Sequence, residues 1–309
     1  MQYTSSILMI RPASFRKNEE TAINNYFQND IKLDARSVIT AAQEEFDTFV
    51  ATLKAAGVTV IVAEDIAEND TPDAVFPNNW ISMHHDGRVA LYPMFAENRR
   101  RERREELLDD LEQAGYLITE IIDYTSAEED EVFLEGTGSL ILDRENSIAY
   151  CSLSERAHED LVIEFCEDFE YTPILFHAYQ TVDNERLSIY HTNVMMCVAD
   201  RFAVVCLECI DDEKERKLVK EQLKASGKIL IPITEAQMHQ FAGNMLQVGR
   251  GALGPALVMS DRAYQSLRAD QLRALESFGP IIHPKLEVIE TCGGGSARCM
   301  MAEIFLPKA

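Results

Sequence analysis

Thr192-Asn-Val-Met195 is one of five similar segments whose spacing indicates the architecture of this chain. In each segment, small or polar residues give way to apolar ones, as expected where a loop enters a half-buried strand. The other four are Asn78-Asn-Trp-Ile81, Thr137-Gly-Ser-Leu140, Gly243-Asn-Met-Leu246 and Ala297-Arg-Cys-Met300. The second residues of all five lie at positions 79, 138, 193, 244 and 298, so the steps between them are 59, 55, 51 and 54 residues. A near-constant period of this size is typical of repeat architectures.

Strands and helices recur with the same period. We expect a helix over 37–56 and strands near 58–62, 117–122, 172–176, 228–233 and 281–282. The fifth unit lacks a following helix, and the N-terminal strand Ser6–Arg11 is expected to complete it and remove a free sheet edge. The sequence therefore predicts an α/β fold of five hairpin-plus-helix units closed around an axis, rather than an α/β sandwich with accidental regularity. No linker interrupts residues 1–309, which we expect to form a single domain.

Composition narrows the classes of partner. The 309 residues carry a formal net charge of −23, which would repel nucleic acid and anionic lipid. No apolar run approaches the ~20 residues of a membrane span, and no signal-peptide pattern precedes Arg11 and Arg16. Seven cysteines, an odd number, indicate a reducing compartment, so we expect a cytoplasmic protein. The partner that we expect is a small molecule. Assembly as a homo-oligomer is left open.

Three patterns that suggest cofactors or nucleic acid fit ordinary structure better. The stretch 249–254 matches G-x-G-x-x-G, but Pro255 and an apolar run follow where a nucleotide-binding helix would start, so a hairpin turn is expected. Cys206-Leu-Glu-Cys209 follows a predicted strand and is expected to be structural. The arginine-rich run 99–104 is interrupted by glutamate and is expected to open an ion-paired helix. The histidines do not cluster, so we predict no metal and no organic cofactor.

Closing the five units would bring residues far apart in sequence to one end of the axis. These are Asn79, Glu135, His191, Asn193, Asn244 and Cys299. Cys299 follows the glycines 293–295, whose amides could hold an oxyanion. A thiol needs a proton acceptor to act as a nucleophile at neutral pH, and His191 has the matching phase. The other candidates, His84, His85 and His158, are expected at the surface, and Glu135 could orient the imidazole in a triad.

Four motifs resemble, in order, the signature of the pentein superfamily, which includes arginine deiminases, dimethylargininases and glycine amidinotransferases. They are Phe76-Pro-Asn-Asn79, Glu135-Gly-Thr-Gly138, His191-Thr-Asn193 and the glycine-rich segment ending in Cys299-Met300. The resemblance implies a five-bladed α/β propeller with Cys299 as nucleophile, His191 as general acid and base, and Glu135 as an orienting carboxylate. It places Phe76, Asn79 and Asn193 among the substrate-binding residues, and the phase of the repeats adds Asn244 to this set.

The resemblance also suggests which arginine binds a substrate carboxylate. Ser154-Glu-Arg156 is similar to a stretch that supplies such an arginine in deiminases. Arg99 and Arg100, just after a predicted hairpin, are the other candidates, because a forked guanidinium pairs well with a carboxylate.

Three positions depart from the guanidine-modifying members of the superfamily. Asn79 and Asn193 stand where those members have aspartates, and Gly138 stands where deiminases have an acid. Burying an unpaired cation costs several kcal/mol, whereas asparagine amides offer both donors and acceptors to a neutral ureido group. We therefore predict a hydrolase, similar to the citrulline-utilisation branch, that converts citrulline to ornithine, ammonia and carbon dioxide through a covalent intermediate on Cys299.

Two other functions stay open. A guanidino-modifying enzyme, such as an arginine hydrolase, a deiminase or an amidinotransferase, would need a carboxylate from elsewhere, for example Asp73 or Asp183. A non-catalytic binding protein of the same fold is the second, although the intact cysteine, histidine and glutamate argue against it. Cys292, seven residues before Cys299, is an alternative nucleophile.

Overall fold

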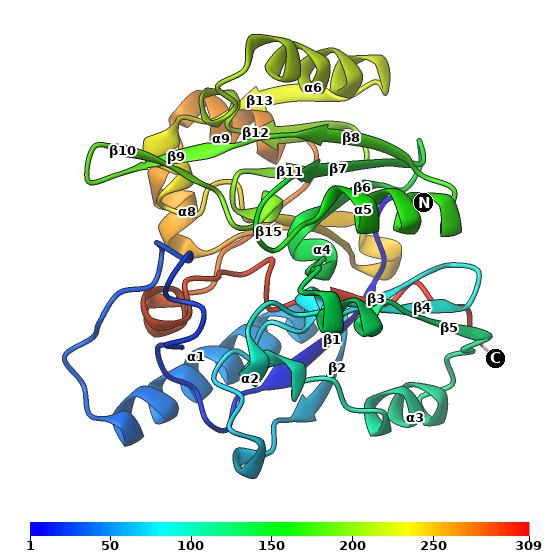
Figure 1. Ribbon diagram of the computed structural model, residues 1–309, viewed down its shortest axis with the longest axis vertical. Helices are drawn as coiled ribbons and strands as arrows, with labels where there is room; N and C mark the ends of the chain where they lie inside the picture. The colour runs from blue at the N-terminus through cyan, green and yellow to red at the C-terminus, as the bar shows by residue number, and fades with distance from the viewer. Residues whose placement is uncertain (309) are drawn as a thin grey trace.

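The computed structural model describes residues 1–308. Within them, fifteen of the strands form five three-stranded sheets, and helices such as α1 (Ala35–Ala55), α3 (Glu106–Gln113) and α6 (Glu213–Ala225) lie toward the periphery (Figure 1). The two remaining strands, β9 (Tyr179–Val182) and β10 (Glu185–Ser188), form a separate hairpin.

All five sheets share one topology. The first two strands pair antiparallel, and the third adds in parallel to the second. In chain order the strands of the first four sheets are β3 (Ile81–Met83), β4 (Arg88–Leu91) and β5 (Glu120–Asp123); β6 (Leu140–Asp143), β7 (Ile148–Ser152) and β8 (Thr172–Phe176); β11 (Met196–Val198), β12 (Phe202–Val205) and β13 (Ile229–Pro232); and β14 (Leu246–Gly249), β15 (Pro255–Val258) and β16 (Ile281–Ile282). The fifth sheet joins the two ends of the chain, with β17 (Ala302–Glu303), β1 (Ser6–Arg11) and β2 (Thr59–Glu64) in that order.

Helices connect the second and third strands of every sheet. Besides α1, α3 and α6, these are α2 (Glu97–Arg100), α5 (Glu159–Asp168), α8 (Asp261–Ser266) and α9 (Ala269–Glu276). Two short helices, α4 (Gly136–Ser139) and α7 (Glu235–Met238), lie between sheets. A parallel connection needs a crossover. Each helix between a second and a third strand therefore returns the chain to the end of the sheet at which the second strand began.

Helix α1 shows how the sequence sets these elements. Asp34 caps its first turn by accepting a hydrogen bond from the Ser37 amide, and Gly57, at φ +95°, follows its end. Its apolar residues recur at helical spacing and pack with β1 in one core cluster. The buried residues of this face are Val38, Ala42, Phe46, Phe49, Val50 and Leu53.

The α/β class, the repeated hairpins and the role of the N-terminal strand as the missing strand of the fifth unit are confirmed. The glycine-rich stretch 249–254 joins the antiparallel strands β14 and β15, so it is a hairpin turn as predicted. The strand predicted at 117–122 is shorter and later, because the Leu117 amide donates to the Pro307 carbonyl before β5 begins at Glu120.

Two sequence predictions are wrong. The arginine-rich run does not open one helix, because α2 ends at Arg100 and α3 begins only at Glu106. His84 is not at the surface: it is buried, its Nε2 lies 2.8 Å from the Ser82 hydroxyl, and its ring stacks on Phe169. The Ser82 hydroxyl at one ring nitrogen, the Arg144 Nη1 at 3.5 Å from the other, and an aromatic ring on one face make burial of a neutral imidazole inexpensive.

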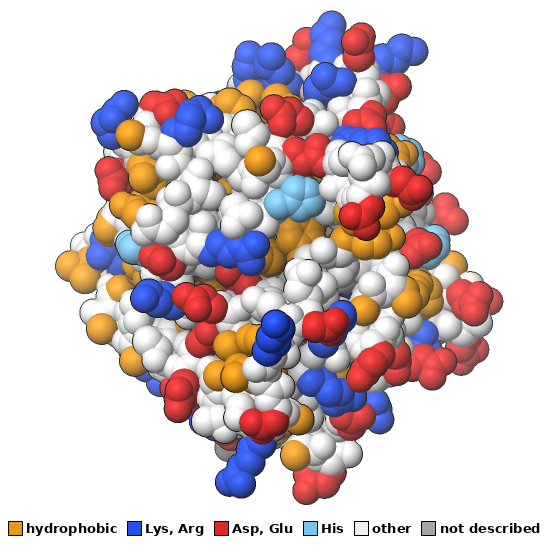
Figure 2. All heavy atoms as spheres, turned by 90° about the vertical axis from the view of Figure 1, so that its left-hand side faces the viewer, with side chains coloured by type: hydrophobic (Ala, Val, Ile, Leu, Met, Phe, Trp, Pro, Cys, Tyr) orange, Lys and Arg blue, Asp and Glu red, His pale blue; other side chains and the backbone are white. Residues whose placement is uncertain are grey.

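Charged side chains of both signs are interspersed over the face seen in Figure 2, with no single-sign field on it. Among the described residues, no helix is long and apolar enough to cross a membrane.

Candidate active site

The starts of the hairpins converge. Short helical turns at Pro77–Asn79, Gly136–Ser139 and Thr192–Val194 precede strands β3, β6 and β11, and α4 contacts both of the other turns. These close approaches depend on small residues. A Cβ at Gly138 would collide with the Asn79 amide nitrogen and lie 3.0 Å from His191, so the site has no room for the acid that deiminases carry there.

A small cavity lies among these turns. It is lined by Asn25, Asp73, Phe76, Asn79, Arg99, Arg156, Tyr190, His191, Gly293, Gly295 and Cys299. The structure thus brings together most of the residues singled out from the sequence. Arg100 is not among them, because its side chain turns outward to the Met94 carbonyl oxygen. Cys292 is buried but does not line the cavity.

His191 and Glu135 form a buried pair. The His191 Nε2 lies 2.6 Å from Glu135 Oε2, and the Phe95 amide donates to the other carboxylate oxygen at 3.0 Å. Burial lowers the pKa of His191 to about 4 although Glu135 opposes this, so the imidazole is neutral at pH 7. Burial would raise the pKa of Glu135, but Arg156 and the hydrogen bond from His191 hold it well below its usual range. With Nε2–H donating to the carboxylate, Nδ1 carries the lone pair that can accept a proton.

Cys299 is surrounded by amides. The side-chain nitrogens of Asn244 and Asn193 lie 3.2 and 3.4 Å from its Sγ. Asn78, in the orientation that satisfies its amide, accepts from the Gly138 amide at 3.2 Å and donates to the Cys299 carbonyl oxygen at 2.6 Å. Within residues 1–308, no carboxylate forms a hydrogen bond with the sulfur.

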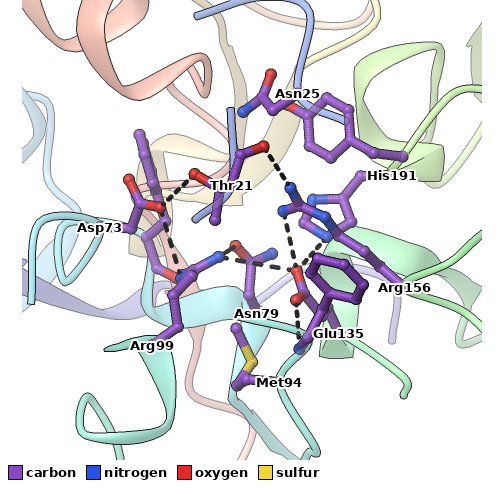
Figure 3. A network of polar contacts seen from close by, with 12 residues as sticks. Thr21, Asn25, Asp73, Asn79, Met94, Arg99, Glu135, Arg156 and His191 are labelled. Carbon is purple, nitrogen blue, oxygen red and sulfur yellow. Dashed lines mark hydrogen bonds and ion pairs between the residues drawn. The ribbon is translucent and has the colours of Figure 1, made fainter. Parts of the chain in front are cut away.

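The two arginines that line the cavity have different partners (Figure 3). Arg99 forms a fork with Glu102 at 2.8 and 2.9 Å, and its Nη1 donates to Asn79 Oδ1 at 2.9 Å. Arg156 donates through Nε and Nη2 to Asn24 Oδ1 and through Nη2 to the Thr21 carbonyl oxygen at 3.1 Å, while its Nη1 makes a longer contact of 3.5 Å with Glu135. Arg99 is therefore committed to the protein, whereas Nη1 of Arg156 keeps capacity for a ligand.

Asp73 supplies a carboxylate that the motif positions lack. It accepts from Asn18 Nδ2 at 2.8 Å and from Thr21 Oγ1 at 3.2 Å through one oxygen, and its other oxygen, Oδ1, is buried without a partner among residues 1–308. Burial raises the pKa of this carboxyl. Asp183, the other carboxylate considered from the sequence, lies exposed in the turn between β9 and β10 and does not reach the cavity.

One wall of the cavity comes from residues 18–29, a segment without regular structure that we call the strap. Asn25 and Gln28 donate to the Gly293 carbonyl oxygen at 3.3 and 3.2 Å, and Tyr190, from outside the strap, donates to Gly294 O at 2.7 Å. Sequence reasoning missed the strap, because it has neither periodicity nor a motif. Its only signal is a concentration of asparagines.

The glycine-rich segment is held by packing. A π-helical turn, Ile289–Gly293, leads into it, and a Cβ at either Gly293 or Gly295 would lie 2.8 Å from the Phe76 ring. The Gly294 amide donates to the Glu290 carbonyl oxygen at 3.1 Å. It is therefore not the free oxyanion donor that the sequence suggested.

A family model described as N,N dimethylarginine dimethylhydrolase, eukaryotic, matches residues 11–306. The chain belongs to this family, within the pentein superfamily. No curated protein sequence matches it.

Solved structures of other pentein members share the fold. Full-length ArgZ, an arginine dihydrolase from the ornithine-ammonia cycle in Cyanobacteria, superposes with a TM-score of 0.74 at 17% identity over 98% of this pentein chain. The chain spans only 41% of the length of that protein. The N-terminal domain of ArgZ, bound covalently to a reaction intermediate, gives 0.72 at 17% identity, with 98% and 99% of the two chains covered. A dimethylarginine dimethylaminohydrolase adduct with S-methyl-L-thiocitrulline gives 0.63 at 13% identity, with 98% and 100% covered.

Proposed function

We propose that the chain is a cysteine-dependent hydrolase that breaks a C–N bond in the terminal guanidino group of an arginine-like amino acid. Asp73 carries this proposal, because it lines the cavity that also holds Cys299 and His191, and its buried Oδ1 has no partner among residues 1–308. A buried polar oxygen without a donor is costly, and a cationic substrate group would satisfy it. The family description, which names a dimethylarginine hydrolase, supports the same substrate class.

Arg156 is the proposed anchor for the substrate carboxylate. Its Nη1 has only the 3.5 Å contact with Glu135, and its guanidinium packs 4.9 Å from the centre of the Tyr190 ring. Paired N–H donors of arginine bind carboxylates in a defined geometry. Arg99 instead holds Asn79 in place.

The reaction uses the neutral imidazole. His191 accepts the thiol proton of Cys299, the thiolate adds to the central guanidino carbon, and the imidazolium returns the proton to the nitrogen that leaves as an amine. A water molecule, deprotonated by His191, then attacks the carbon bound to sulfur. Collapse of that adduct restores the thiolate and releases a carbonyl product, which from arginine is citrulline if a terminal nitrogen left as ammonia.

Citrulline itself is the second candidate substrate, and the orientation of Asn79 favours it. Arg99 can only donate, so Asn79 Oδ1 must face Arg99, and its NH₂ group lies beside Gly138. Amide donors suit a ureido carbonyl oxygen, which a guanidinium lacks. Cleavage there would release ornithine and leave a carbamoyl group on Cys299, which water converts to carbamate and then to ammonia and carbon dioxide.

We further propose that the five units close around one axis and that the whole chain acts as one catalytic unit. The shared topology of the sheets supports this, as do the contacts of β17 with β3 and of β6 with β11 in neighbouring sheets.

A product assay with two carboxylate variants tests the proposal. Purified protein is given arginine, dimethylarginine and citrulline separately, and ornithine, citrulline and ammonia are measured by mass spectrometry. We expect turnover of a guanidino substrate that is lost in Cys299→Ser. Asp73→Asn should then lower kcat/KM for guanidino substrates by at least tenfold, while Asp183→Asn, the matched exposed carboxylate, changes nothing.

Each outcome assigns the site differently. Turnover of citrulline alone would contradict the guanidino proposal and support the second candidate. If Asp73→Asn lowered kcat/KM equally for all substrates, Asp73 would instead bind the α-amino group that these substrates share. If the wild-type protein turned over none of the three compounds, a binding role would be favoured.

A further inference from the structure

Two asparagine amides approach the sulfur of Cys299 from neighbouring units. Asn244 Nδ2 lies 3.2 Å from Sγ and Asn193 Nδ2 lies 3.4 Å from it, and both residues are fully buried. We infer that Asn244, assisted by Asn193, is a catalytic residue that stabilises the Cys299 thiolate by donating N–H···S hydrogen bonds. This inference rests on the proposed role of Cys299 as nucleophile.

The protein fixes the direction of the Asn244 amide. The backbone N–H of Arg298 donates to Asn244 Oδ1 at 3.0 Å, so the oxygen faces away from the sulfur. The amide nitrogen has two hydrogens. One is directed to the Asn193 carbonyl oxygen at 3.0 Å, which leaves the other for Sγ. If the Asn244 amide were flipped, its oxygen and nitrogen would exchange places, and the contacts with the Arg298 amide, the Asn193 carbonyl oxygen and Sγ would all be lost. The donor is therefore preorganised.

A glycine makes this approach possible. A Cβ at Gly243 would lie 2.6 Å from the Met195 carbonyl carbon, so any other residue would push the fourth hairpin start away from the third. Gly243 thus brings Asn244 beside Asn193 and the sulfur.

The electrostatics of the cavity explain why such donors are needed. A cysteine thiolate is often stabilised by an adjacent imidazolium, but burial keeps His191 neutral at pH 7. The guanidinium groups that line the cavity are paired, Arg99 with Glu102 and Arg156 with Thr21, Asn24 and Glu135. Hydrogen bonds to an ionised acceptor are roughly twice as strong as neutral ones, so two amide donors favour the thiolate over the thiol.

The inference is tested through the reactivity of the Cys299 thiol, which can be measured without a substrate. The rate of Cys299 alkylation by iodoacetamide is measured against pH, with peptide mapping by mass spectrometry to separate Cys299 from the other six cysteines. Asn244→Asp keeps the acceptor for the Arg298 amide but removes both N–H donors. We expect its alkylation midpoint to move to higher pH by at least one unit. Asn193→Ala, which removes a side chain bonded only to Sγ, should move it less and in the same direction.

Asn184→Asp is the charge control, because it adds the same negative charge at an exposed position in the turn between β9 and β10. An unchanged midpoint in both site variants, each folded by circular dichroism, would overturn the inference. A midpoint shift in a protein that turns over none of the three compounds would support the inference while contradicting the proposed function, so the two failures can be told apart.

Discussion

At the scale of single residues, the His191–Glu135 pair sets the protonation state of the site. Both partners of this 2.6 Å hydrogen bond are buried, and burial changes the pKa of the imidazole more than the hydrogen bond to Glu135 does. In the folded protein His191 stays neutral until about pH 4, whereas an unfolded histidine protonates near pH 6.5.

This difference predicts a titration. We expect the ring resonances of His191, assigned by their absence in His191→Gln, to move at about pH 4. Because the unfolded chain binds this proton first, the pair also makes stability fall as pH decreases from 6.5 toward 4. A ring that titrates near pH 6.5 in the folded protein would contradict the account.

Removal of the carboxylate gives a second prediction at this scale. Glu135→Gln keeps the shape of the side chain but can donate to His191, so it no longer fixes which nitrogen carries the proton. We expect kcat to fall by roughly 10²–10⁴-fold, the usual contribution of general acid–base catalysis. KM should change little if Glu135 acts only through His191. A loss confined to KM would mean that the carboxylate binds substrate instead.

Residue types could be predicted from the sequence, but their partners could not. The phase of the repeats placed Cys299, His191 and Asn79 in one cavity. The same reasoning could not separate Arg99, Arg100 and Arg156, because their roles depend on which carboxylates surround each guanidinium. Only the three-dimensional neighbourhood shows that Arg99 is occupied by Glu102 and that Arg100 points away.

At the scale of elements, the π-helical turn Ile289–Gly293 carries the glycine-rich segment. Glu290 is buried in this turn, and its Oε1 accepts from the Ser296 hydroxyl at 2.6 Å. The Ser296 carbonyl oxygen in turn accepts from the Cys299 amide at 3.0 Å. Burial raises the pKa of Glu290 to about 7.

Glu290 should therefore make stability depend on pH. Its folded pKa lies above the ordinary value of 4.5, so the folded state binds the proton more tightly than the unfolded state between these values. This contribution is fully present below pH 4.5 and is lost as pH rises through 7. We expect Glu290→Gln to unfold with a smaller decrease in stability between pH 5 and 7 than the wild-type protein in urea titrations. An identical slope in both proteins would show that Glu290 does not titrate there.

The strap is the element that the sequence could not predict. Its contribution is a set of hydrogen bonds to residues that line the cavity. Asn18 and Thr21 donate to Asp73, Asn25 and Gln28 donate to the Gly293 carbonyl oxygen, and Asn24 accepts from Arg156. Such bonds leave no periodic signature, whereas the buried face of α1 does.

At the scale of the whole molecule, the chain closes its fifth sheet with both of its ends. Strand β1 lies between β17 and β2, and its Ile7, Leu8 and Met9 are buried. The sequence predicted this because the fifth unit lacked a following helix, and the period of the repeats made that gap visible. Closure of the five units into a ring remains a proposal.

Two substitutions test how much the N-terminal strand β1 contributes to stability. Met9→Ala should lower the free energy of unfolding by about 2–5 kcal/mol, because it leaves a cavity in a fully buried site. Leu253→Ala, at a side chain that is 65% exposed, should change it by less than about 0.5 kcal/mol. Both are measured by urea denaturation. Equal effects would mean that β1 is not part of the cooperative core.

The most direct measurement of the central claim is a search for a covalent intermediate on Cys299. The protein is mixed with arginine, quenched in acid during turnover, digested and examined by mass spectrometry, with citrulline in a parallel reaction. The account predicts an adduct on the peptide that contains Cys299, absent in Cys299→Ser, which should also be inactive. Turnover by Cys299→Ser, or an adduct on Cys292 instead, would contradict it.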